Sequence, residues 1–339
     1  MSAPQRGSPA AHAADQPSIH VTKRTDRSTP MLLLQHFLKP LSSTKATQLP
    51  KTHYPPGSPR LDPDKKAARL CEVVERRVND IYIYDLLANK PAETAPGEPR
   101  RRKRLYYFAG GGWQIPASPE HWTLLTEMAR RIPDTIPSLI STPLAPSSPA
   151  ADTIPHLLTL YHTLLANAVD ANEEVILAGD SSGGNIILCL TLAALHANPS
   201  SPAPIALMCI SPSTDLTRTN PTIPQISKHD PLLTLPKITS SAKTWRGALA
   251  PTDPLVSPLY SEDIALLAQR DIKVHGVVGE YDILGPDAVL MREKCNEAGV
   301  KGEWLNWEKQ MHCFPLTFGY GLKEGKEGLE WILDVLRRC

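Results

Sequence analysis

The stretch of residues 175–190 constrains the fold of this chain more than any other. An apolar run at residues 175–178 ends in a G-x-S-x-G pattern made by Gly179, Ser181 and Gly183, and a second apolar run follows at once. A strand, a sharp turn and a helix in this order lift a serine hydroxyl above the edge of a sheet. The pattern alone also occurs in ordinary turns, so the flanking elements carry the interpretation. We therefore predict that Ser181 is a nucleophile.

Apolar segments of strand and helix character alternate along most of the chain. Such an alternation predicts an α/β fold in which helices flank a mainly parallel sheet. The predicted strands lie within residues 71–87 and at residues 105–108, 136–140, 175–178, 205–210, 272–278 and 302–307.

Two further polar residues follow predicted strands near the carboxyl terminus. Asp282 comes after the strand at residues 272–278, and His312 comes after the last strand. Because the carboxyl ends of parallel strands meet at one edge of a sheet, we expect Ser181, Asp282 and His312 to converge there. His312 would act as the general base and Asp282 would orient it. Glu280 and Asp287 are rival acids close by.

Three consecutive glycines, Gly110, Gly111 and Gly112, follow the strand at residues 105–108. Glycine loses much conformational entropy on folding, so such a run suits a backbone that must approach another group closely. Bare amides in this place, together with the amide of Ser182, would form an oxyanion hole. The alternative interpretation is a flexible turn.

Proline is unusually frequent, at 34 of 339 residues, and it concentrates in connections. Residues 1–30, rich in Ala, Pro and Ser, are predicted to be disordered. Residues 31–339 would form one catalytic domain, with a cap contributed by about residues 31–65 and 217–258. The apolar helix predicted at residues 31–41 would serve as a lid, pack on the core, or touch a membrane surface.

Charge and cysteine spacing exclude several classes of protein. A net charge of +1 gives no general attraction to nucleic acid, and we interpret the basic run at residues 100–104 as a solvated arm that enters a strand. The six scattered cysteines show no metal-ligand spacing and suit reduced thiols in the cytoplasm. No apolar run reaches about 18 residues, so we expect no stable membrane insertion. The sequence leaves the oligomeric state open.

Several motifs together resemble the hormone-sensitive-lipase branch of the α/β-hydrolase superfamily, which is also called the α/β hydrolase fold-3 type. In the sequence of these motifs and in loop chemistry, the chain is most similar to the fungal members of that branch. The resemblance covers about residues 70–339. Its motifs are Gly-Asp-Ser181-Ser-Gly-Gly-Asn, the triple glycine before Trp113, Ser-Pro-Ser-Thr-Asp215-Leu, Ser257-Pro-Leu, Tyr-Asp282-Ile-Leu and His312-Cys-Phe.

This resemblance implies an eight-stranded sheet, a small helical cap and carboxylic-ester hydrolysis through an acyl-serine intermediate, without cofactor or metal. We expect a small lipophilic ester as the substrate, because Trp113, residues 31–41 and the region around Trp245 are the predicted walls of the pocket, and we assign Trp113 and Asp180 to the binding site. Two positions depart from the family pattern. Ala109 replaces the usual histidine before the three glycines, and Ser147 stands where a Leu-Ala-Pro loop commonly continues with Glu.

Other functions use the same fold. An acyltransferase, thioesterase or cyclase of secondary metabolism would use the same three residues and pass the acyl group to a different acceptor, or release it from a thioester. A non-catalytic receptor, like the similar plant gibberellin receptors, would lack the catalytic histidine. The presence of His312 argues against a receptor.

Overall fold

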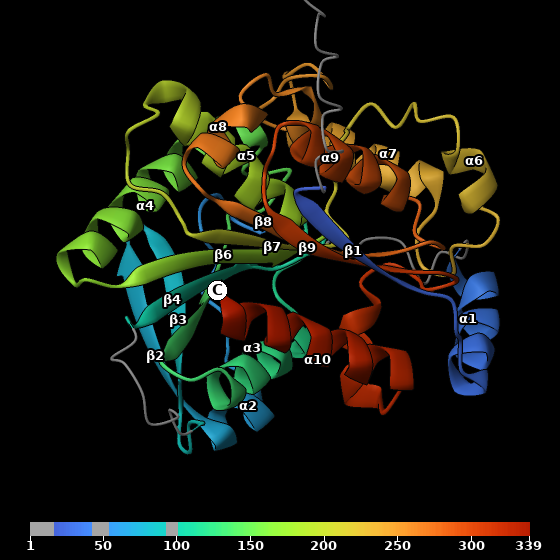
Figure 1. The fold of residues 1–339 in the computed structure, drawn as a ribbon, viewed down its shortest axis with the longest axis horizontal. Helices are drawn as coiled ribbons and strands as arrows, with labels where there is room; N and C mark the ends of the chain where they lie inside the picture. The colour runs from blue at the N-terminus through green and yellow to red at the C-terminus, as the bar shows by residue number, and fades with distance from the viewer. Residues whose placement is uncertain (1–16, 43–53, 93–100) are drawn as a thin grey trace, which may run out of the picture.

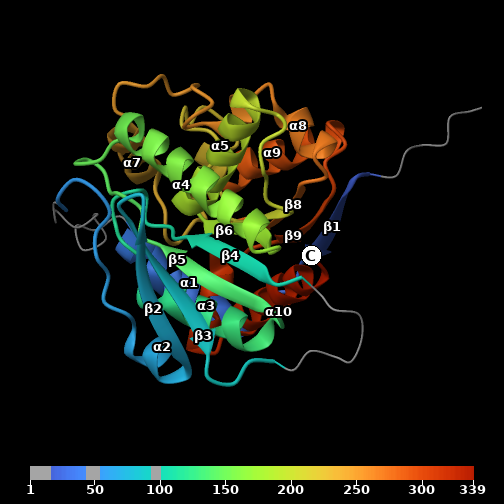
Figure 2. The same cartoon turned by 90° about the vertical axis from the view of Figure 1, so that its left-hand side faces the viewer.

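The computed structural model describes residues 17–42, 54–92 and 101–339. A nine-stranded sheet in the order β1-β9-β8-β7-β6-β4-β5-β3-β2 runs through the centre of the molecule (Figures 1 and 2). The predicted α/β fold with a mainly parallel sheet is confirmed, although the sheet has nine strands rather than eight. Only β3 pairs antiparallel, with β2 and β5. The strands are β1 (Ile19–Arg24), β2 (Cys71–Val78), β3 (Ile81–Ala88), β4 (Lys103–Phe108), β5 (Thr135–Ile140), β6 (Glu174–Asp180), β7 (Ala206–Ile210), β8 (Lys273–Gly279) and β9 (Gly302–Trp307).

Helices cover both faces of the sheet. Figures 1 and 2 show α4, α5, α8 and α9 on one face and α2, α3 and α10 on the other, with α6 and α7 above the carboxyl ends of the strands. The α-helices are α1 (Thr29–Ser42), α2 (Lys65–Leu70), α3 (Pro119–Arg131), α4 (Ala150–Asp170), α5 (Ser182–Ala197), α6 (Ile223–Ile226), α7 (Leu235–Arg246), α8 (Ile264–Gln269), α9 (Gly285–Glu297) and α10 (Lys323–Arg338); η2 (Pro258–Tyr260) and η3 (Phe314–Tyr320) are 3₁₀ helices.

The central strands are buried on both faces, which explains their continuous apolar sequences. In β6, for example, every residue from Val175 to Asp180 is buried, because helices pack above and below it. Two large apolar clusters result, one on each side of the sheet. The amphipathic helix α3 closes one of them with Trp122, Leu125 and Met128, which lie on one face of the helix.

The predicted disorder of residues 1–30 is wrong for residues 17–30. Strand β1 pairs in parallel with β9, from Ile19 beside Gly302 to Arg24 beside Trp307. The open edge of β9 offers unpaired backbone groups, and the alternation of apolar and polar residues in β1 fits such an edge, with Ile19 buried in the core. Residues 1–16 lie outside the described part of the chain.

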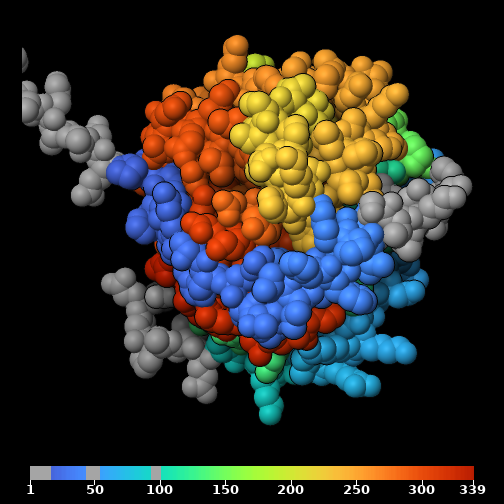
Figure 3. Space-filling model, turned by 90° about the vertical axis from the view of Figure 1, so that its right-hand side faces the viewer, coloured from blue at the N-terminus to red at the C-terminus, as the bar shows by residue number. Residues whose placement is uncertain are grey.

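The predicted helix at residues 31–41 is present as α1, and it packs on the core through the fully buried Met31. Figure 3 shows the N-terminal segment (blue) lying across this face of the molecule, with part of the 217–258 insertion (yellow) directly above it. Lys39 ties the two together, because its Nζ donates to the carbonyl oxygens of Ser227 and Asp230, each at 2.7 Å. The helix therefore supports the insertion from outside.

Candidate active site

Ser181 lies in the sharp turn between β6 and α5, as predicted. Its backbone has φ 52° and ψ −115°, a conformation that costs a non-glycine residue about 1–3 kcal/mol. The turn is fixed by hydrogen bonds, because the Ser181 amide donates to Ile210 at 2.9 Å and its carbonyl accepts from the Ser213 amide at 3.1 Å. These contacts hold the Ser181 side chain at the carboxyl edge of the sheet, at the start of α5.

A glycine is required at the second residue of α5. A Cβ at Gly183 would lie 1.8 Å from the carbonyl oxygen of Phe108, the last residue of β4. The bare backbone therefore lets α5 approach β4 closely, which brings the loop that follows β4 beside Ser181. The G-x-S-x-G pattern thus reflects packing as well as the turn.

The structure brings His312 and Asp282 together. His312 Nδ1 lies 2.8 Å from Asp282 Oδ2, and the other carboxylate oxygen accepts the amide of Leu284 at 2.9 Å. Asp282 is fully buried, so its orientation is fixed by these contacts. This arrangement leaves Nε2 of His312 as the ring nitrogen that can exchange a proton with a neighbour.

Burial alone would lower the pKa of His312, but the charge of Asp282 outweighs it and raises the pKa well above its usual value. The thiol of Cys313 lies 3.4 Å from His312 Nε2 and 3.6 Å from Asp180 Oδ2. Burial raises the pKa of Cys313 to about 12, so this thiol is neutral near neutral pH. Asp282 is therefore the group that stabilises the protonated imidazole.

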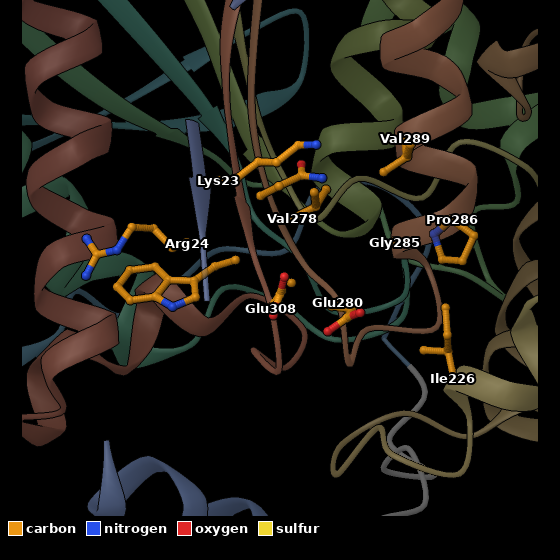
Figure 4. A pocket seen from close by; sticks show the side chains of 12 residues that line it. Lys23, Arg24, Ile226, Val278, Glu280, Gly285, Pro286, Val289 and Glu308 are labelled. Atoms are coloured by element: carbon orange, nitrogen blue, oxygen red, sulfur yellow. The ribbon is translucent and has the colours of Figure 1, made fainter. Parts of the chain in front are cut away.

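The two rival acids lie elsewhere. Glu280 accepts the amide of Lys309 at 3.2 Å and lines a separate cavity of about 340 Å³, beside Glu308 and Lys23 (Figure 4). Asp287 accepts a hydrogen bond from Asn220 at 2.8 Å. Neither has a hydrogen bond to His312 among the described residues, so the geometry favours Asp282.

The glycine loop after β4 divides into two parts. The amide of Gly110 donates to Asp180 Oδ1 at 2.8 Å, so the predicted role of Gly110 as an oxyanion donor is wrong. A Cβ at this position would lie 2.2 Å from Asp180 Oδ2, which explains why a glycine stands here. Gly111 and Gly112, both with positive φ, line the cavity beside Ser181. With the amide of Ser182 at the start of α5, they remain the candidate oxyanion donors.

Asp180 holds this loop in place. Its Oδ1 also accepts the Tyr107 hydroxyl at 2.8 Å and lies 3.1 Å from His121 Nε2. Burial would raise the pKa of Asp180, but the interaction with His121 and the hydrogen bonds donated by Gly110 and Tyr107 outweigh it and keep the pKa below its usual value. Asp180 thus has a structural role; because it also lines the cavity beside Ser181, its predicted role in substrate binding stays a prediction. This network braces a loop that has Ala109 in place of the family histidine.

Ser181 and His312 open onto one cavity of about 640 Å³, whose lining is mainly apolar. Trp113 is part of its wall and stacks on Trp245, with ring centroids 5.6 Å apart and an angle of 6° between the planes. The insertion contributes Leu232, Leu233, Lys237, Ile238 and Ser241 to the lining, as expected of a cap. None of the lining residues comes from α1, so the predicted lid role of that helix finds no support in this cavity.

Sequence reasoning missed three side chains near Ser181. His121 lies in the first turn of α3, and its Nδ1 accepts the amide of the N-cap residue Ser118 at 2.9 Å. This local capping contact gives no sign of the second contact, to Asp180. Tyr107 lies within an apolar strand, where a buried aromatic residue is expected. Arg218 follows the Ser-Pro-Ser-Thr-Asp motif and turns into the cavity. Only the three-dimensional fold reveals these partners.

A nucleophile turn, a buried histidine–aspartate pair and bare loop amides at one sheet edge define the α/β-hydrolase class. A family model described as alpha/beta hydrolase fold matches residues 105–316, and the chain belongs to this family. Its relatives place it in the hormone-sensitive-lipase branch; the predicted similarity to fungal members stays a prediction.

Among curated relatives, an esterase of Acinetobacter venetianus is 29% identical over 237 residues, which cover 68% of this chain and 75% of that protein. Human hormone-sensitive lipase is 30% identical over 153 residues, 44% of this chain but only 14% of the lipase. Among solved structures, an esterase/lipase from an uncultured bacterium superposes with a TM-score of 0.74 at 21% identity, over 92% of this chain and 99% of that chain. This last similarity concerns the fold.

Proposed function

We propose that Ser181, His312 and Asp282 form the catalytic triad of this carboxylic ester hydrolase. The observation that carries the proposal is the contact of 2.8 Å between His312 and the fully buried Asp282, beside the strained turn of Ser181. The esterase of Acinetobacter venetianus and the hormone-sensitive lipases support the same reaction type.

The proposed reaction begins at Ser181. His312 Nε2 takes the proton of the serine hydroxyl, whose oxygen attacks the ester carbonyl, and Asp282 stabilises the imidazolium that forms. The amides of Gly111, Gly112 and Ser182 stabilise the negative oxygen of the tetrahedral intermediate. His312 then gives its proton to the leaving alcohol, and water releases the acyl group from the serine by the same steps.

The substrate is a small-molecule ester, and we propose that its organic part is lipophilic. The stacked Trp113 and Trp245 and the leucines of the insertion support this preference. The cysteines are free thiols, which supports the proposed location in the cytoplasm. Within the described residues, no helix is both long and apolar enough to cross a membrane.

Replacing Ser181 tests the assignment. In Ser181→Ala we expect kcat for 4-nitrophenyl butyrate to fall by about 10⁴–10⁶-fold, because the nucleophile is lost. An alkyl phosphonate should label the wild type at Ser181 and leave the variant unlabelled, with mass spectrometry as the measurement. Ser240→Ala, at an exposed position of α7 outside the cavity, is the matched control and should stay active. Undiminished turnover in Ser181→Ala would contradict the triad.

A further inference from the structure

The cavity beside Ser181 has two different walls. Towards α3 and η3 the polar lining includes Glu120, whose carboxylate partners the hydroxyl of Tyr320. Towards the insertion the lining carries two cations, Arg218 and Lys237. Charge is therefore distributed unevenly around the nucleophile.

Arg218 is a buried cation without a counter-ion in contact. The residue is 8% exposed, and its guanidinium donates to two neutral acceptors, the Asp215 carbonyl oxygen at 2.6 Å and Ser213 Oγ at 2.8 Å. Its Nε is buried without a hydrogen-bond partner among the described residues. None of the ion pairs found in the described chain includes Arg218. Burying a charge in this way is costly unless an anion pairs with it.

The carboxylates around Arg218 affect its pKa without contacting its guanidinium. Burial lowers its pKa to about 10, and Asp287, Asp215 and Asp282 oppose this shift without forming an ion pair. Asp215 accepts from Thr217 and Asp282 holds His312, while Asp287 accepts from Asn220 through Oδ1 and its Oδ2 is buried without a hydrogen-bond partner among the described residues. Arg218 therefore remains a cation at neutral pH, with donors left for another acceptor.

Arg218 is linked to the nucleophile Ser181 through one residue, Ser213. Its partner Ser213 also lines the cavity, and the Ser213 amide donates to the carbonyl oxygen of Ser181 at 3.1 Å. Lys237 lines the same wall from α7, and its ammonium has no hydrogen bond or ion pair within the described residues. Two cations thus face a cavity where an ester must lie to react with Ser181.

We infer that the insertion-side wall binds an anionic group, and that the esters hydrolysed here carry a carboxylate a few atoms from the scissile bond. A guanidinium recognises a carboxylate through paired hydrogen bonds, and Lys237 adds a second positive charge. The remaining apolar lining would accommodate the rest of the substrate. This inference rests on the proposed function and specifies the substrate class of the same site.

The test compares matched esters. One pair is the 4-nitrophenyl half-ester of glutarate against 4-nitrophenyl pentanoate, which have the same acyl length and differ by a terminal carboxylate. The other is 3-carboxyphenyl butyrate against phenyl butyrate, where the carboxylate is on the leaving group. The quantity measured is the ratio of kcat/KM within each pair. Intrinsic reactivities cancel because this ratio is compared between wild type and variants.

We expect Arg218→Met to lower the ratio by about 10–100-fold in at least one pair, as a hydrogen bond to a charged group is lost. Arg218→Lys should recover part of it. Lys237→Gln should lower the ratio by about 3-fold, since this side chain is partly exposed. Lys243→Gln removes the same charge from an exposed position of α7 outside the cavity, and should leave the ratio unchanged.

A binding measurement separates this inference from the proposed function and does not depend on turnover. By calorimetry, glutarate should bind Ser181→Ala, and adding Lys237→Gln or Arg218→Met should weaken that binding.

Two outcomes separate the proposals. If neutral esters are hydrolysed while both ratios and glutarate binding are the same in all variants, the anionic subsite is refuted and the proposed esterase function is retained. If no ester is hydrolysed but glutarate binding depends on Arg218 and Lys237, the proposed function fails and the subsite stands. Should Arg218→Met not fold, Lys237→Gln decides by the same measurements.

Discussion

Two buried charged groups flank Ser181, and their surroundings are opposite. On the sheet side, Asp180 accepts hydrogen bonds from Tyr107 and Gly110 and pairs with His121. On the insertion side, Arg218 donates only to uncharged oxygens and keeps an unpartnered Nε. A charge whose partners are complete stabilises structure, whereas a charge with spare donors is suited to a ligand. The comparison therefore assigns a structural role to Asp180 and a role in substrate selection to Arg218.

The largest expected effect is on kcat, and it comes from a substitution beside Asp180, on the sheet side of the site. In Gly110→Ala the new Cβ would lie 2.2 Å from Asp180 Oδ2 and 3.1 Å from the Ser181 Cβ, so the glycine loop must shift. We expect kcat to fall by about 10²–10³-fold, the cost of losing an oxyanion donor. Turnover of 4-nitrophenyl butyrate is the measurement. Gly319→Ala, at an exposed site where a Cβ meets nothing within 4 Å, is the matched control. Normal kcat in Gly110→Ala would show that the loop tolerates this shift.

The next prediction contrasts the two charges directly, with chemical denaturation as the measurement. Asp180→Asn removes the anion that pairs with His121 and should lower the free energy of unfolding by about 3 kcal/mol. Arg218→Met removes a cation that no carboxylate contacts. It should change that free energy by about 1 kcal/mol or less, because relief of the buried charge offsets two lost hydrogen bonds. Equal losses in both variants would remove the proposed distinction between the two sides.

The smallest expected effect concerns pH. Burial would lower the pKa of His121, but Asp180 outweighs it and the pKa is raised. A group whose pKa is higher in the folded state stabilises the fold fully below its unfolded pKa and loses that contribution as the pH rises through the folded value. The advantage of wild type over His121→Gln in unfolding free energy should therefore be complete below about pH 6.5, the usual pKa of histidine, and should shrink as the pH rises above it.

The sequence predicts the sheet, the nucleophile turn and the order of Ser181, Asp282 and His312 because each follows from local chemistry at the end of a strand. Apolar strand sequences and turn residues are short-range signals, and the edge rule of parallel sheets supplies the convergence. The same reasoning assigned Gly110 to the oxyanion hole, since a glycine run does not reveal which amide is already bonded. That choice depends on Asp180, which lies 70 residues away in the chain.

Contacts between distant residues account for the other differences. Strand β1 lies in a segment whose Ala-, Pro- and Ser-rich composition predicts disorder, and its partner β9 lies near the other end of the chain. His121 and Arg218 belong to no recognisable motif, and each acquires its role only from what the fold places beside it. Such positions are decided by tertiary packing rather than by the pattern of neighbouring residues.

The pairing of β1 with β9 also bears on how the protein matures. Ile19 and Gly302 are register partners, so β1 cannot pair with β9 until β9 has been synthesised. Contacts between residues so far apart in sequence slow folding. Nascent chains halted before residue 302 would therefore expose residues 19–24 to proteases, and completion of β9 would protect them.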